Sequence, residues 1–183
     1  MDHADHVRLL EGGIVTRGGT WGDFGSGRGA FTMAIAELIG PEGMIYSVDK
    51  NQAALQEQAR AVKRRFSDQQ PKIHYIHGDY RRWLPLPALD GAVMANSLHF
   101  YEDKRAILKS IHGYLNPHGR LILVEYNTDL GNSWVPFPIS YDGWQVLADQ
   151  SGFERTSLLA RVPSSFLGEI YSALSYKIAA RDK

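Results

Sequence analysis

Short apolar runs alternate with longer amphipathic segments along most of this chain of 183 residues. This alternation is typical of parallel strands, because consecutive parallel strands need a crossover connection, usually a helix, that covers one face of the sheet. The chain is 44% hydrophobic and 22% charged, a composition that suits one globular domain with its own core. The pattern therefore predicts an α/β fold and argues against a disordered or fibrous chain.

The expected elements follow one another in βα order as far as residue 126. We expect strands at residues 20–24, 44–49, 73–77, 89–95 and 120–126. Helices are expected at residues 30–39, 52–66 and 104–114, and residues 116–119 are expected to form a turn.

The pattern changes after residue 126. A helix at residues 141–150 precedes two expected strands, at 153–161 and 170–180, with no helix between them. These two strands should pair antiparallel at the end of the sheet. The fold class is therefore a Rossmann-like, seven-stranded, mostly parallel sheet with a terminal antiparallel strand pair. We expect one domain over residues 1–183, with residues 1–19 as a covering segment that holds a short helix near Val7 to Leu10.

Charge and cysteine content exclude several classes of protein. Lys plus Arg and Asp plus Glu each total 20, so no broad positive field is available and we expect no nucleic-acid partner. The absence of cysteine excludes disulfides, thiolate nucleophiles and cysteine-ligated metals, and we expect no metal site. We see neither a leader peptide nor a membrane span, so we expect a cytoplasmic protein.

A glycine-rich segment, Gly25-Ser26-Gly27-Arg28-Gly29, stands where the first strand turns into the first helix. Glycine permits positive φ angles and a close approach of a ligand to the backbone, while the start of the helix offers free N–H groups. This segment predicts a cofactor site at the carboxyl edge of the sheet. The other interpretation, a turn used only for close packing, does not require glycine at three alternating positions.

Two classes of cofactor fit this loop. The spacing Gly25-x-Gly27-x-x-Ala30, with Asp49 after the second strand, matches the relaxed pattern of dinucleotide-binding proteins. Asp23 favours the other class, because a carboxylate beside the loop repels a pyrophosphate but attracts an ammonium group.

At this point the chain resembles the class I S-adenosylmethionine-dependent methyltransferases, whose first motif is an acid followed by Gly-x-Gly-x-Gly. The resemblance covers nearly the whole chain and includes the terminal antiparallel strand pair. Residues 116–121 are similar to the turn before the fifth strand in the small-molecule branch that includes quinone-biosynthesis enzymes. The resemblance implies S-adenosylmethionine as cofactor and a small-molecule acceptor that is methylated on oxygen, nitrogen or carbon.

The resemblance also implies roles for individual residues. Asp23 would hold the ammonium group, Asp49 the ribose, and Asp79 with Tyr80 the adenine. Asp49 could instead cap the next helix, and Asp79 could cap a turn beside a packing Tyr80. The full set of expected cofactor-binding residues is Asp23, Gly25, Ser26, Gly27, Gly29, Asp49, Lys50, Asp79, Tyr80 and Asn96.

His99 and Glu125 are the candidate catalytic residues, because they follow the fourth strand and end the fifth, beside the expected methyl donor. His99 has an unperturbed pKa near neutrality and is the better candidate for a general base. His99 could instead hold the loop or the following helix by hydrogen bonds, and Glu125 could merely be solvated at the end of its strand. The Asn- or Asp-Pro-Pro-aromatic motif of many amino methyltransferases is absent, since residues 96–99 read Asn-Ser-Leu-His.

Aromatic residues cluster after the fifth strand, where they could line an acceptor pocket or pack on the sheet: Trp134, Phe137, Tyr141 and Trp144. Two other functions stay open. One is a small NAD(P)-dependent reductase, although no Tyr-x-x-x-Lys pair is recognisable. The other is a non-catalytic S-adenosylmethionine-binding protein. We expect a monomer or a homodimer.

Overall fold

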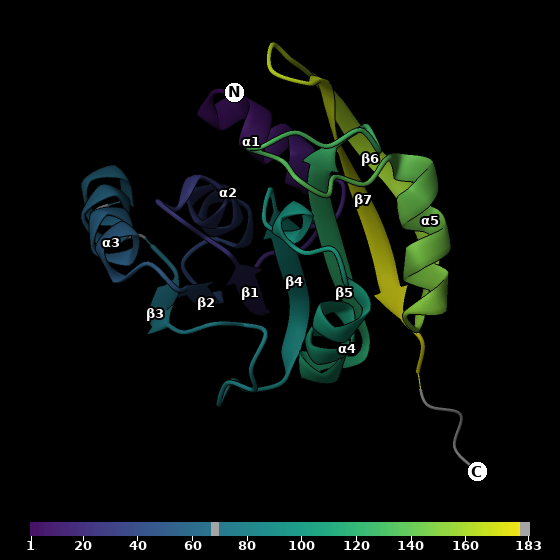
Figure 1. Cartoon of the computed structure of the whole chain (residues 1–183). Coiled ribbons are helices and arrows are strands. Elements are labelled where there is room, and N and C mark those ends of the chain that lie inside the picture. Colours follow the sequence, from purple (N-terminus) through teal and green to yellow (C-terminus); the bar gives the residue numbers. More distant parts are fainter. Residues whose placement is uncertain (67–69, 180–183) are drawn as a thin grey trace.

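The protein folds around one seven-stranded sheet with the strand order β3-β2-β1-β4-β5-β7-β6 (Figure 1). The computed structural model describes residues 1–66 and 70–179. Strands β1 to β5 run parallel, and β7 pairs antiparallel with both β5 and β6. The strands are β1 (Thr20–Phe24), β2 (Met44–Asp49), β3 (Lys72–His77), β4 (Leu89–Ala95), β5 (Leu115–Tyr126), β6 (Phe153–Ser164) and β7 (Gly168–Lys177).

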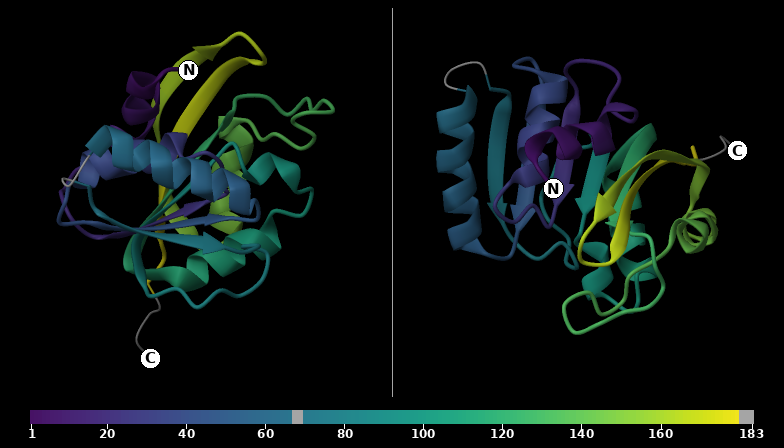
Figure 2. Two further views of the ribbon diagram at one scale, coloured as in Figure 1. Left: turned by 90° about the vertical axis from the view of Figure 1, so that its left-hand side faces the viewer. Right: turned by 90° about the horizontal axis from the view of Figure 1, so that it is seen from above.

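Helices cover both faces of the sheet, as the two views in Figure 2 show. One face carries α1 (His3–Glu11), α2 (Ala30–Ile39) and α3 (Gln52–Phe66), and the other carries α4 (Arg105–Tyr114) and α5 (Tyr141–Gln150). A short 3₁₀ turn, η1 (Leu98–Phe100), follows β4. Within the described ranges, no helix has the length and apolar character needed to cross a membrane.

Strand β5 separates two hydrophobic cores, because successive side chains of a strand point to opposite faces. Leu121 and Leu123 belong to the core beneath α4 and α5. Ile122 and Val124 belong to the core beneath α1 and α2. All four side chains are fully buried, which explains why the strand reads as a continuous apolar run rather than an alternating one.

The expected fold class is confirmed, and most element bounds agree with the sequence-based expectations. The third strand begins one residue earlier than expected and the fourth helix one residue later. The last two strands are confirmed as an antiparallel pair at the end of the sheet, with different bounds. Residue 180, the expected end of the last strand, lies outside the described residues.

The expected turn at residues 116–119 is wrong as a boundary, since β5 already begins at Leu115. Leu115 pairs with Leu89 and Arg120 with Gly91, so residues 116–119 form a bulge within the strand. The Asn116 amide donates to Asp90 across the bulge at 2.9 Å. Turn-forming residues therefore bend the strand without ending it.

The carboxyl ends of β1 and β4 meet at the position where the strand order reverses. β1 lies between β2 and β4, and its connections lead to opposite halves of the sheet. In open α/β sheets the loops diverge at such a position and leave a crevice. The glycine loop and the residues after β4 both lie there.

Gly91 provides a test of packing inside β4. A Cβ atom at this position would collide with the ring of Trp21, which is 3% exposed. Gly91→Ala should therefore lower the free energy of unfolding by about 1–3 kcal/mol in urea titrations. Gly113→Ala is the matched control, because a Cβ there meets no atom within 4 Å. Equal effects of the two substitutions would contradict this packing.

Candidate functional site

The loop between β1 and α2, residues 25–29, has a backbone that requires glycine at alternate positions. The φ angles are 83° at Gly25, 53° at Gly27 and 85° at Gly29. A Cβ on Gly25 would lie 2.5 Å from Ser97 Cβ, and a Cβ on Gly29 would collide with Gln58. The glycines therefore provide both the conformation and the space for neighbouring side chains.

The end of β2 holds this loop in place. The N–H groups of Gly25 and Ser26 both donate to the Val48 carbonyl, at 2.8 and 3.1 Å. The N–H of Gly27 donates to Asp49 Oδ2 at 2.8 Å, and Asp49 Oδ1 accepts from Asn51 N at 2.7 Å. The side chain of Asn51, and not that of Asp49, accepts the N–H of Ala54 at the start of α3. The helix-capping interpretation of Asp49 is therefore wrong.

A cavity of about 160 Å³ opens beside the loop, at the carboxyl ends of β1 to β4. It contains two carboxylates, one lysine and several backbone groups, alongside aromatic rings. Six of the expected cofactor-binding residues line it: Gly25, Asp49, Lys50, Asp79, Tyr80 and Asn96. The sequence reasoning did not single out its other lining residues as ligands: Gly78, Ser97, Phe100 and Tyr101.

Asp79 and Tyr80 lie on the β3 side of this cavity. The Arg81 guanidinium donates to both carboxylate oxygens of Asp79 and holds the pKa of that carboxyl below its usual value. Tyr80 is 6% exposed, and its hydroxyl donates to the Ser97 carbonyl at 3.1 Å. Asp79 is thus an ionised acceptor, and Tyr80 ties the loop after β3 to the loop after β4.

Asn96 has a strained backbone at the end of β4. Its φ angle is 49°, which is uncommon for a residue other than glycine. Its Oδ1 atom is buried without a hydrogen-bond partner. Backbone strain and buried polar atoms without a partner are concentrated at functional sites. Asn96 has both, and it lies in the wall of the cavity.

Asp23, Ser26, Gly27 and Gly29 are expected cofactor-binding residues that do not line the cavity. Asp23 is 1% exposed and accepts a hydrogen bond of 2.5 Å from the Thr32 hydroxyl. Burial raises the pKa of Asp23 to about 7, although the Thr32 hydrogen bond opposes this effect. Asp23 is therefore a buried group beneath the loop, close to half ionised near neutral pH.

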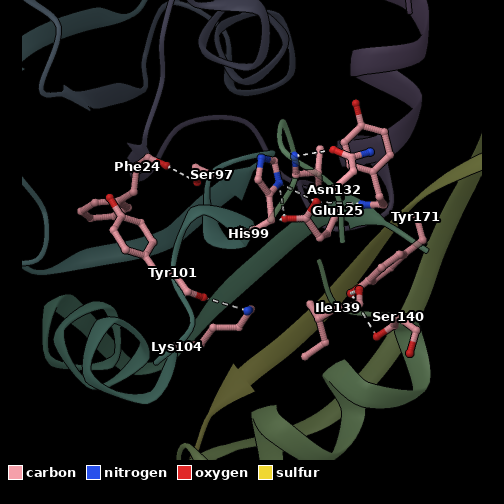
Figure 3. Close-up of polar contacts among 12 residues, drawn as sticks. Phe24, Ser97, His99, Tyr101, Lys104, Glu125, Asn132, Ile139, Ser140 and Tyr171 are labelled. Carbon is pink, nitrogen blue, oxygen red and sulfur yellow. Dashed lines mark hydrogen bonds and ion pairs between the residues drawn. The ribbon is translucent and has the colours of Figure 1, made fainter. Parts of the chain in front are cut away.

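His99 and Glu125 form a buried pair next to the cavity (Figure 3). His99 Nδ1 lies 2.8 and 2.9 Å from the two carboxylate oxygens, and the backbone N–H groups of His99 and Tyr126 also donate to Glu125. An ionised carboxylate only accepts hydrogen bonds, so Nδ1 carries the proton. No described residue hydrogen-bonds to Nε2, the other nitrogen of the ring.

Phe137 joins the segment of this pair to the loop after β5, and Lys104 lies beside the Phe137 ring. Lys104 is buried, with 8% exposure. Its Nζ donates to the Tyr101 carbonyl at 2.9 Å, and burial lowers its pKa. Nζ also lies 5.9 Å from the centre of the Phe137 ring. The N–H of Phe137 donates to the His99 carbonyl at 3.0 Å. The loop at residues 127–140 is thus fastened to the segment that carries the histidine.

The aromatic residues after β5 divide between surface and core. Trp134 is 75% and Phe137 38% exposed, whereas Trp144 is fully buried. Tyr141 packs edge-to-face on Tyr171, with 5.8 Å between the ring centroids. Packing is therefore the role of Trp144, and of these four residues Trp134 and Phe137 are the most open to a ligand.

Gln58, Thr32 and Ser47 were missed by sequence reasoning, although all are fully buried beneath the glycine loop. The spacing of Leu55, Gln58 and Val62 was the available signal, because these residues lie on the buried face of α3. A polar residue at a core position of an amphipathic helix requires hydrogen-bonding partners.

Comparison with known proteins identifies a family. A family model described as a methyltransferase domain matches residues 23–119, just over half of the chain. Demethylmenaquinone methyltransferase of Geobacillus sp. (strain WCH70) is 29% identical over 101 residues, which cover 54% of this chain and 42% of that protein. The chain matches less than half the length of the curated relatives.

Solved structures match nearly the whole chain. The 1,6-didemethyltoxoflavin-N1-methyltransferase of Burkholderia thailandensis has a TM-score of 0.76 at 18% identity, covering 96% of this chain and 78% of its own. A SAM-dependent methyltransferase from Aquifex aeolicus has a TM-score of 0.71 at 15% identity, covering 97% of this chain and 100% of its own. At these identities the similarity shows the fold.

The raised pKa of Asp23 predicts a pH-dependent stability. A group whose pKa is higher in the folded state stabilises that state at low pH and loses this contribution as pH rises towards 7. Asp23→Asn keeps the shape and cannot ionise. The stability of the variant relative to the natural protein should therefore increase between pH 4 and 7, by at most about 1.4 kcal/mol per pH unit. Urea unfolding of both proteins at several pH values tests this. A constant difference between their free energies of unfolding across this pH range would contradict it.

Proposed function

The chain belongs to the methyltransferase domain family, and from this membership we propose that it transfers a methyl group from S-adenosylmethionine to a small-molecule acceptor. The observation that carries the proposal is the cavity between the glycine loop and the carboxylates that follow β2 and β3. Relatives and structural neighbours that are methyltransferases support it.

The residues of the cavity fit this cofactor. Gly25 contributes backbone to the cavity wall, Asp49 is an acceptor for ribose hydroxyls, and Asp79 is an acceptor for the adenine amino group. The unpaired Oδ1 of Asn96 provides a further acceptor in the same wall once the side chain turns. Asp23 attracts the ammonium group as a buried charge beneath the loop rather than as a lining residue.

His99 is the proposed general base, and Glu125 is its positioning residue. When bound, S-adenosylmethionine supplies a methyl group already activated by its sulfonium charge. His99 Nε2 takes the proton of an acceptor hydroxyl or acidic carbon, and Glu125 stabilises the resulting imidazolium through Nδ1–H. Burial of both side chains excludes water from the pair.

The acceptor surface is aromatic. Ring centroids lie 4.3 Å apart for His99 and Phe100, 6.1 Å for His99 and Tyr126, and 5.9 Å for Tyr126 and Phe166. Phe100 is 55% and Phe166 50% exposed, so this row of rings leads from the cavity to the β6–β7 hairpin tip, where it is open to solvent. The exposed rings at the two ends of this row, Phe100 and Phe166, favour a planar apolar acceptor.

Several finer assignments belong to the same proposal. We propose that residues 1–183 form one domain that acts in the cytoplasm as a monomer or homodimer, with α1 as a covering helix packed on α2, β6 and β7. The balanced charge of the chain favours a small-molecule acceptor over a nucleic acid. Membership in the methyltransferase family favours this function over the NAD(P)-dependent reductase.

Binding of S-adenosylhomocysteine, measured by calorimetry, tests the cofactor. The natural protein should bind it, and Asp49→Ala should weaken binding at least about tenfold, because a lost hydrogen bond to a charged group costs about 1.5–3 kcal/mol. Asp149→Ala, at an exposed position on α5, is the control. Binding of NADH without binding of S-adenosylhomocysteine would overturn the proposal.

Turnover tests the base. With 1-naphthol as probe acceptor, His99→Gln should reduce kcat by about 10²–10⁴-fold, the usual contribution of a general base. Glu125→Gln should reduce kcat less, because the amide still meets Nδ1. Neither variant should change the affinity for S-adenosylhomocysteine. Production of S-adenosylhomocysteine by His99→Gln at the natural rate would refute the assignment, and binding without turnover across aromatic acceptors would favour the non-catalytic alternative.

A further inference from the structure

Gln58 occupies the centre of a buried polar network beneath the glycine loop. Its side chain extends from α3 and is fully buried. Nε2 donates to Thr32 Oγ1 of α2 at 2.6 Å and to Ser47 Oγ of β2 at 2.9 Å. Oε1 accepts from Ser26 Oγ at 3.4 Å. One amide thus connects α2, β2 and the glycine loop.

The direction of these hydrogen bonds is set by the amide. Since Gln58 Nε2 donates to Thr32 Oγ1, the Thr32 hydroxyl proton is directed to its other close partner, Asp23 Oδ2, at 2.5 Å. On the other branch, Ser47 Oγ donates to Ser26 Oγ at 2.7 Å. The Gln58 amide therefore directs the Thr32 hydroxyl towards Asp23. It also holds the side chain of Ser26 in the glycine loop.

We propose that Gln58 is a positioning residue for cofactor binding: it keeps the glycine loop in its binding conformation and keeps the Thr32 hydroxyl directed at Asp23. This inference rests on the proposed function. The collision between Gln58 and any Cβ at position 29 supports it independently of the hydrogen bonds, because the loop and the amide are packed in direct contact.

The charge at Asp23 links this network to the affinity for a cationic ligand. Asp23 faces Thr32 on α2, and Asp49 on β2 is the charged neighbour that disfavours its ionisation. Without the amide, the Thr32 hydroxyl can rotate away from Asp23. Asp23 then ionises at higher pH, and less negative charge remains beneath the loop near neutral pH.

Calorimetric titration with S-adenosylhomocysteine at pH 7 and pH 9 tests the proposal on the full chain. Gln58→Met keeps the length of the side chain and removes all its hydrogen bonds. It should weaken binding at least about fivefold at pH 7 and by a smaller factor at pH 9, where Asp23 is ionised in both proteins. Gln56→Met, the same substitution at an exposed position of α3, should leave the affinity unchanged. The ammonium group of the ligand titrates identically in every variant.

Other outcomes separate the two proposals. If folded Gln58→Met binds S-adenosylhomocysteine as tightly as the natural protein at both pH values, the positioning role is overturned and the proposed function stays intact. This holds even where the variant is less stable. Absence of binding by the natural protein would overturn both. Should Gln58→Met fail to fold, Thr32→Val removes the donor to Asp23 at nearly constant volume and should show the same greater loss at pH 7. If the ratio of the natural affinity to that of Thr32→Val is the same at pH 7 and pH 9, the proposal is overturned.

Discussion

Close contact between the glycine loop and its neighbours sets the geometry of the whole site. Ser97, from the loop after β4, packs where the Cβ of residue 25 would lie, and Gln58, from α3, packs where the Cβ of residue 29 would lie. Two glycines thus bring together loops that follow different strands. The cavity has its shape because these side chains fill the space that any larger residue would need.

Three carboxylates converge at this edge of the sheet, and each has a different environment. Asp79 is paired with Arg81, Asp49 accepts backbone N–H groups, and Asp23 is buried with Thr32 as its donor. Negative charges that lie close together repel one another and raise the electrostatic free energy of the site. A ligand that brings hydroxyl donors and a positive charge relieves this repulsion, which matches the chemistry of a sulfonium amino acid attached to a nucleoside.

The sequence predicted the sheet and most element bounds because apolar periodicity and glycine punctuation report local structure. It also placed most cavity residues, since these residues directly follow strands. It did not predict the bulge at residues 116–119, which depends on Asp90 in another strand. It did not predict the role of Gln58, and it left open whether Trp144 lines a pocket or packs on the sheet, because both depend on which elements pack together.

The hydrogen bond from Phe137 to the His99 carbonyl gives the loop after β5 a mechanical role. Because this loop carries exposed apolar side chains and is hydrogen-bonded to the segment that holds His99, displacement of the loop would move the backbone of the proposed base. Under the proposed function, exchange of exposed side chains of the loop, such as Leu130 and Trp134, would alter acceptor choice, while the hydrogen bond at Phe137 preserves the position of the histidine. Selectivity and proton transfer would then vary as separable traits within a single short segment.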